Sequence, residues 1–132
     1  MEHFIKWHAS DISQKIFIEQ LQEEIVITKH EILIIKKFLV PEFIENFPET
    51  EEVLEELKNK GIKLILISNS PPPSKDALKK LHLTQFFDKT IFSCDINLMK
   101  PSKEIFYFAI KNLNIDPHEI LMVGDSLEKD IE

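Results

Sequence analysis

The stretch that decides the fold is Ile120-Leu121-Met122-Val123-Gly124-Asp125-Ser126, near the end of a 132-residue sequence. A short apolar run that stops at Gly-Asp-Ser predicts a buried strand that ends where a helix begins. In open parallel sheets, ligands bind at the carboxyl ends of the strands. We therefore expect the carboxylate of Asp125 to lie where chemistry takes place. An acid directly after a buried strand is also costly unless it has a partner.

The sequence upstream of this stretch alternates between strand-like and helix-like segments. Apolar runs predict strands at 62–67, 90–93 and 120–123, and apolar residues at helical spacing predict helices at 48–60, 74–82 and 101–113. Continuous apolar strands between helices indicate a parallel sheet that is covered on both faces. We predict an α/β fold with a Rossmann-like parallel sheet over residues 47–132.

The first part of the sequence has a different pattern. Apolar residues recur at near-helical spacing after Ser10-Asp11, and a second helical pattern over residues 28–40 closes at Val40-Pro41. No convincing strand is present before residue 47. We predict a small helical subdomain over residues 1–46.

Composition excludes several classes of partner and location. The formal net charge is −7, from 23 acidic and 16 basic residues, which disfavours binding to nucleic acid. No stretch approaches the ~18 apolar residues of a membrane span, and the N-terminus lacks the pattern of a secretory signal. The single cysteine, Cys94, forms no internal disulfide. We expect a cytoplasmic protein without nucleic-acid or membrane partners, and the sequence leaves the oligomeric state open.

Polar side chains follow each of the three predicted strands. Ser68-Asn69 follows the first, Lys100 lies in the loop after the second, and Asp125 follows the third with Asp130 one turn later. A hydroxyl, an ammonium and two carboxylates at one sheet edge suit phosphoryl chemistry with Mg²⁺, which prefers oxygen ligands. Each residue also has a plainer interpretation: Lys100 as a solvated lysine, or Asp130 as an acid that is favourable near a helix N-terminus.

Three ordered motifs make the pattern specific. Leu64-Ile65-Leu66-Ile67-Ser68-Asn69, Lys100-Pro101-Ser102-Lys103-Glu104-Ile105-Phe106 and Val123-Gly124-Asp125-Ser126-Leu127-Glu128-Lys129-Asp130-Ile131 resemble the second, third and fourth motifs of the haloacid dehalogenase-like (HAD) hydrolase superfamily. The resemblance implies a partial Rossmann-like HAD core over 47–132 and a helical cap remnant over 1–46.

The resemblance also implies roles for individual residues. Ser68 and Asn69 would bind the substrate, with Ser68 hydrogen-bonded to the transferring phosphoryl group, and Lys100 would be the catalytic residue that stabilises its charge. Asp125 would ligate Mg²⁺, and Asp130 would support that metal site. The implied reaction is Mg²⁺-dependent hydrolysis of a small phosphorylated metabolite through an aspartyl-phosphate; a minority of the family removes halogen or transfers phosphoryl groups.

The family's first motif, Asp-x-Asp-x-Thr after an apolar strand, is missing from the sequence. No aspartate has an acid two residues later and an apolar strand before it; the aspartates are Asp11, Asp76, Asp88, Asp95, Asp116, Asp125 and Asp130. In the family, that strand lies between the second-motif and fourth-motif strands, so its loss leaves unpaired strand edges. We expect an incomplete, inactive fragment of a HAD hydrolase.

Two alternatives stay open. The chain could be a non-catalytic pseudoenzyme or interaction module on a HAD scaffold, which cooperative folding of the chain alone would favour. A response-regulator receiver also places Asp, Ser or Thr, and Lys at strand ends, but it requires an acidic pair after its first strand. Here the first strand ends in Ser68-Asn69.

Two further local features carry expectations. Pro71-Pro72-Pro73 predicts a stiff extended loop after the first strand. Cys94 follows the second predicted strand, and we expect a small buried residue there and not a nucleophile. The five histidines show neither helical pairing nor cysteine companions, so they predict no metal site.

Overall fold

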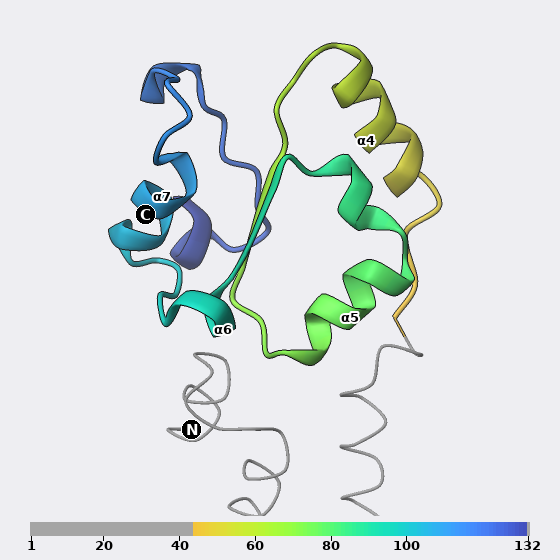
Figure 1. Ribbon diagram of the computed structural model, residues 1–132, viewed down its shortest axis with the longest axis horizontal. Helices are drawn as coiled ribbons and strands as arrows, with labels where there is room; N and C mark the ends of the chain where they lie inside the picture. The colour runs from red at the N-terminus through yellow and green to blue at the C-terminus, as the bar shows by residue number, and fades with distance from the viewer. Residues whose placement is uncertain (1–43, 132) are drawn as a thin grey trace, which may run out of the picture.

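The computed structural model describes residues 44–131, in which helices lie on both sides of two parallel strands (Figure 1). The elements in chain order are α4 (Thr50–Asn59), β1 (Ile65–Ser68), α5 (Pro73–Lys80), the 3-10 turn η2 (Leu83–Phe86), β2 (Lys89–Phe92), α6 (Ser93–Ile96), α7 (Lys103–Ile110), the 3-10 turn η3 (Pro117–Glu119) and the π-helical turn η4 (Leu127–Ile131). The helical subdomain predicted for 1–46 falls almost wholly outside the described residues. The mixed α/β class with a parallel sheet is confirmed.

Helix α4 ends where the sequence predicted. Gly61 has a φ of +75°, a conformation that costs glycine little. Its N–H donates to the carbonyl of Lys58 at 2.9 Å, and the N–H of Ile62 donates to the carbonyl of Leu57 at 3.1 Å. This pair of bonds is a Schellman motif, which satisfies the last carbonyls of the helix and turns the chain toward β1.

The two strands pair in parallel with their carboxyl ends at one edge. Ile65 lies opposite Lys89, and Ser68 lies opposite Phe92. The first two predicted strands are confirmed, although β1 begins three residues later than the apolar pattern suggested. The residues that follow Ser68 and Phe92 therefore meet at the same end of the sheet.

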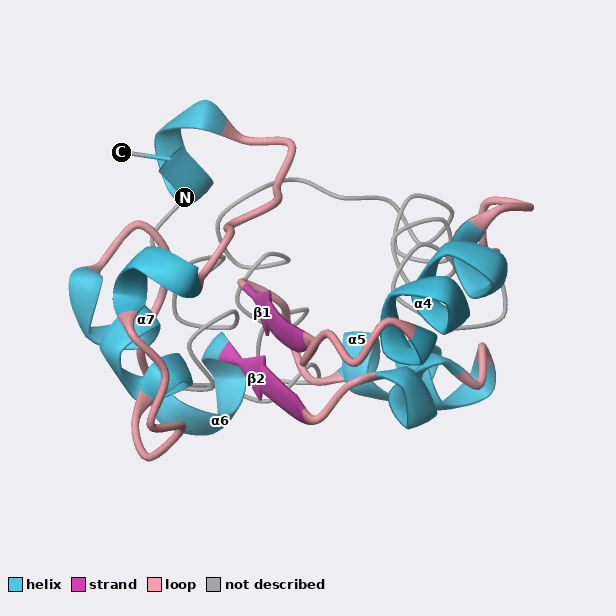
Figure 2. Ribbon diagram, turned by 90° about the horizontal axis from the view of Figure 1, so that it is seen from above, coloured by secondary structure: helices cyan, strands magenta, loops and turns pink. Residues whose placement is uncertain are grey.

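Helix α7 supplies the core that covers one face of the sheet. Ile105 is 0% exposed and packs with Ile91 and Ala109, and further apolar side chains surround this cluster: Ile65, Ile67, Ile96, Leu98, Phe106 and Ile110. Figure 2 shows α7 on one side of the strands and α4 with α5 on the other. Because α7 begins three residues after Lys100, packing of Ile105 fixes the position of the lysine loop.

The third predicted strand, 120–123, is wrong. The structure assigns no strand there, and the residues Leu121 and Val123 are 85% and 81% exposed. Within residues 44–131 the sheet contains β1 and β2 alone, so the segment lacks a ladder partner. Apolar residues without a neighbouring strand gain neither backbone hydrogen bonds nor burial.

The stiff extended loop predicted at Pro71-Pro72-Pro73 is also wrong. Pro72 has helical dihedral angles, φ −50° and ψ −38°, and Pro73 is the first residue of α5. Proline is favourable at a helix start because its fixed φ suits the first turn and its missing N–H would have had no partner. The prolines therefore begin a helix directly after the polar residues that follow β1.

Candidate functional site

A buried hydroxyl fixes the loop that follows β1. Ser93, the first residue after β2, is 0% exposed. Its Oγ accepts a hydrogen bond from the N–H of Ser70 at 3.1 Å and donates to the carbonyl of Ser70 at 3.4 Å. The hydroxyls of Ser68 and Ser70 are hydrogen-bonded to each other. Ser93 belongs to no motif in the sequence, and its position at the end of a strand parallel to β1 is the signal that points to it.

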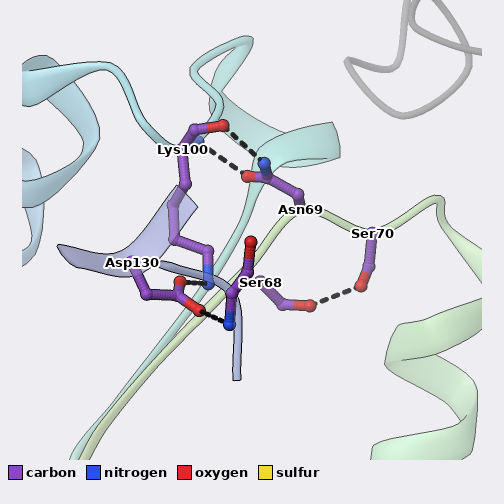
Figure 3. Close-up of polar contacts among 6 residues, drawn as sticks. Ser68, Asn69, Ser70, Lys100 and Asp130 are labelled. Carbon is purple, nitrogen blue, oxygen red and sulfur yellow. Dashed lines mark hydrogen bonds and ion pairs between the residues drawn. The ribbon is translucent and has the colours of Figure 1, made fainter. Parts of the chain in front are cut away.

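Asn69 binds the backbone of Lys100 through both ends of its amide. Its Nδ2 donates to the Lys100 carbonyl at 2.7 Å, and its Oδ1 accepts from the Lys100 N–H at 2.8 Å (Figure 3). Two hydrogen bonds to one residue fix both its distance and its orientation. The loop after β1 and the loop before α7, 31 residues apart in the chain, are therefore joined at this point.

Lys100 in turn forms an ion pair with Asp130. Lys100 Nζ lies 2.5 Å from Asp130 Oδ1, and the two side chains are 13% and 2% exposed (Figure 3). Asp130 Oδ2 accepts a second hydrogen bond from the N–H of Ser126 at 3.1 Å. The Lys100 hydrogen bond holds the pKa of the Asp130 carboxyl below its usual range, against the opposing effect of burial, and the Ser126 N–H acts in the same direction as the lysine. Asp130 therefore carries its negative charge at neutral pH.

Gly124 makes room for the Asp130 carboxylate. A Cβ atom at position 124 would lie 2.2 Å from Asp130 Oδ2 and 2.4 Å from its Cγ. These distances are far below van der Waals contact, so any larger residue would displace the carboxylate. The glycine of the Gly-Asp-Ser stretch is therefore required by this close approach.

The five residues predicted from the sequence fall into two groups. Hydrogen bonds link Asn69, Lys100 and Asp130 directly. Ser68 and Asp125 lie outside this chain of hydrogen bonds. Ser68 precedes Asn69, and its hydroxyl is bonded to that of Ser70. Asp125 precedes Ser126 and is exposed. Asp125 does not follow a buried strand, because the apolar segment before it is itself exposed; of the two acids, Asp130 is the one that is buried and ion-paired. The functional roles of all five residues stay predictions.

The carboxylates of Asp125 and Asp130 are the candidate donors at this site for a hard cation that keeps most of its waters. Asp125 presents an exposed carboxylate, and Asp130 uses one oxygen for Lys100 and the other for Ser126, although a carboxylate has about four lone-pair sites. Across residues 44–131 there is no group of three or more His, Cys, Asp or Glu side chains placed to hold a metal ion. One or two carboxylates with several waters is an arrangement that Mg²⁺ accepts and that transition metals seldom use.

Comparison with known proteins gives consistent matches. The family model described as haloacid dehalogenase-like hydrolase matches residues 2–132. A phosphorylated carbohydrates phosphatase of Thermotoga maritima is 32% identical over 92 residues, which is 69% of this chain and 43% of that protein. A glyceraldehyde 3-phosphate phosphatase of Methanothermobacter thermautotrophicus is 34% identical over 86 residues, which is 64% of this chain and 38% of that protein. The chain thus spans less than half the length of these curated relatives.

Solved structures agree with these matches. A HAD phosphatase from Thermococcus onnurineus superposes with a TM-score of 0.70 at 30% identity, covering 96% of this chain and 54% of that one. A putative beta-phosphoglucomutase from Thermotoga maritima gives a TM-score of 0.66 at 26% identity, covering 90% and 58% of the two chains.

Proposed function

The chain belongs to the haloacid dehalogenase-like hydrolase family, and from this premise we propose that it carries the phosphoryl-binding and metal-binding edge of a Mg²⁺-dependent phosphoester hydrolase. The observation that carries the proposal is the buried ion pair between Lys100 and Asp130, whose lysine backbone is bound by Asn69. A lysine held beside a carboxylate at the carboxyl end of a parallel sheet is suited to a phosphate group beside a cation.

Each side chain has a role in this proposal. Lys100, whose side chain is 13% exposed, donates through its ammonium to the oxygens of the phosphoryl group and offsets the charge that develops on them. The Ser68 hydroxyl adds a neutral hydrogen bond to the same group. Asp125 and Asp130 would hold Mg²⁺, with Asp125 as the exposed ligand and Asp130 as the buried one. When bound, Mg²⁺ neutralises phosphate charge and orients the group for in-line attack.

We propose further that the chain alone is an incomplete site. In the family, the carboxylates of Asp-x-Asp-x-Thr act as nucleophile and as acid and base, and no such sequence occurs among the 132 residues. Lys100 and Ser68 can bind and polarise a phosphoryl group, but neither is an aspartate that could accept it. Turnover therefore requires a polypeptide segment that supplies the two missing carboxylates.

The proposed substrate is a small phosphorylated metabolite. The two curated relatives described above are named for a phosphorylated carbohydrate and for glyceraldehyde 3-phosphate. Their shared chemistry is a phosphomonoester on a short polar carbon skeleton.

Among the described helices, none is both long and apolar enough to cross a membrane.

A chimeric enzyme tests the proposal. The segment of the Thermotoga maritima phosphatase that aligns with this chain is replaced by residues 47–131, so that the remaining segments come from the relative. We expect Mg²⁺-dependent release of phosphate from a phosphorylated sugar. Lys100→Met and Asp125→Asn should each lower kcat by about 10²–10³, the usual cost of removing one charge-stabilising group.

The chimera also has a matched control. Lys103→Met removes an exposed lysine at the start of α7, three residues from Lys100, and should leave kcat unchanged. A folded chimera whose activity is the same with and without Lys100 would contradict the proposal. A folded chimera without any turnover would favour the non-catalytic module instead.

A further inference from the structure

We propose that Asn69 is a positioning residue that sets where the Lys100 ammonium lies, a role that rests on the proposed function of Lys100. The resemblance to the family implies that Asn69 binds the substrate. In the structure, its amide Nδ2 and Oδ1 both bind the backbone of Lys100, at 2.7 and 2.8 Å. The polar atoms of the side chain are thus directed at the lysine loop.

Lysine needs such an anchor more than most residues do. Its four-carbon stem is flexible, and its ammonium is a point charge without the fixed geometry of a guanidinium. Here the stem is held at both ends, by Asn69 at the backbone and by Asp130 at Nζ. With its backbone and its ammonium both fixed, the charge occupies one place at the end of the sheet.

Asn69 is itself held from the other side. The next residue, Ser70, is bound through its N–H and carbonyl by the buried hydroxyl of Ser93, which follows β2. The residues therefore form a chain of contacts from β2, through Ser93, Ser70 and Asn69, to Lys100. The parallel pairing of β1 with β2 determines where this chain of contacts begins.

The test measures how fast the Lys100 amine is acetylated in the folded 132-residue chain. An amine-reactive acetylating reagent is used with peptide mass spectrometry, and Lys63, which is exposed and follows α4, serves as the internal reference. In Asn69→Ala the rate at Lys100 relative to Lys63 should rise by roughly fivefold, as expected for the loss of one or two hydrogen bonds. Asn69→Asp keeps an acceptor for the Lys100 N–H and loses the donor, so its rate should lie between wild type and Asn69→Ala.

Two outcomes would overturn the proposal. One is an unchanged rate of acetylation at Lys100 itself in a folded Asn69 variant. The other is an equal rise at Lys63 and Lys100, which would indicate general loosening of the structure. If Asn69→Ala does not fold, Asn69→Asp gives the same comparison. Because acetylation needs no phosphate and no Mg²⁺, its result is independent of the proposed function.

The chimera distinguishes positioning from substrate contact. If Asn69 acts through Lys100, Asn69→Ala should lower kcat and change KM little, since it removes an interaction of the lysine with the transition state. A rise in KM with unchanged kcat would show that Asn69 binds substrate directly and would overturn the positioning role.

Discussion

Truncating Ile105 to alanine is expected to lower the free energy of unfolding by about 2–5 kcal/mol, the usual cost of a large cavity in a core. Ile105 is 0% exposed and packs α7 against Ile91 and Ala109. Since domains of this size are stable by only about 5–15 kcal/mol, the loss would remove a large part of the total. Urea denaturation of the chimera, followed by circular dichroism, measures it.

A surface truncation provides the control for Ile105. Val53 on α4 is 49% exposed, and Val53→Ala should change the free energy of unfolding by no more than about 0.5 kcal/mol. Equal effects of the two substitutions would show that α7 does not pack on the sheet as described. Loss of α7 packing would also release the loop that carries Lys100, because the helix begins at Lys103.

Gly124→Ala is expected to break the Lys100–Asp130 pair without removing either partner. The new Cβ would lie 2.2 Å from Asp130 Oδ2, so the carboxylate must move away from the lysine. Overpacking of this kind costs about 1–3 kcal/mol of stability. In the chimera, kcat should fall by about 10²–10³, close to the loss expected for Lys100→Met, because the ammonium loses its anchor.

Gly61→Ala is the matched control for Gly124. Among residues 44–131, no atom beyond the chain neighbours lies within 4 Å of a Cβ at position 61. The φ of +75° is unfavourable for alanine, so the substitution should cost stability through the backbone alone. The chimera should keep its kcat with Gly61→Ala. If Gly124→Ala and Gly61→Ala reduced kcat equally, the loss would come from general destabilisation and not from the displaced carboxylate.

Local patterns predicted the parts of this fold that local interactions determine. The sequence indicated three of these parts: the apolar strand before Ser68, the glycine that ends α4, and the helix after Pro101. Strand burial and helix ends depend on neighbouring residues, so a local pattern is enough to predict them. The segment 120–123 has an equally strong apolar pattern, and yet it is not a strand. A strand also needs a partner, and its own sequence does not provide one.

The site shows the same division. Order and spacing indicated that Ser68, Lys100 and Asp130 belong to one region, and the structure joins Lys100 to Asp130. Three features depended on contacts between distant segments and were not visible in the sequence: the hydrogen bonds from the Asn69 amide to the Lys100 backbone, the hydrogen bonds of the buried Ser93 hydroxyl to Ser70, and the burial of Asp130 against Lys100. Each of these contacts joins residues from different loops, so no repeating pattern along the sequence predicts it.

The central claim is that this chain holds the lysine and carboxylates of a phosphohydrolase site without the nucleophile. The most direct measurement is Mg²⁺-dependent phosphate release from p-nitrophenyl phosphate by the unmodified 132-residue chain, with the chimera as the positive control. We predict a rate equal to that of Asp125→Ala and to the background, while the chimera turns over. Mg²⁺-dependent turnover by the chain alone that disappears in Asp125→Ala would contradict the claim.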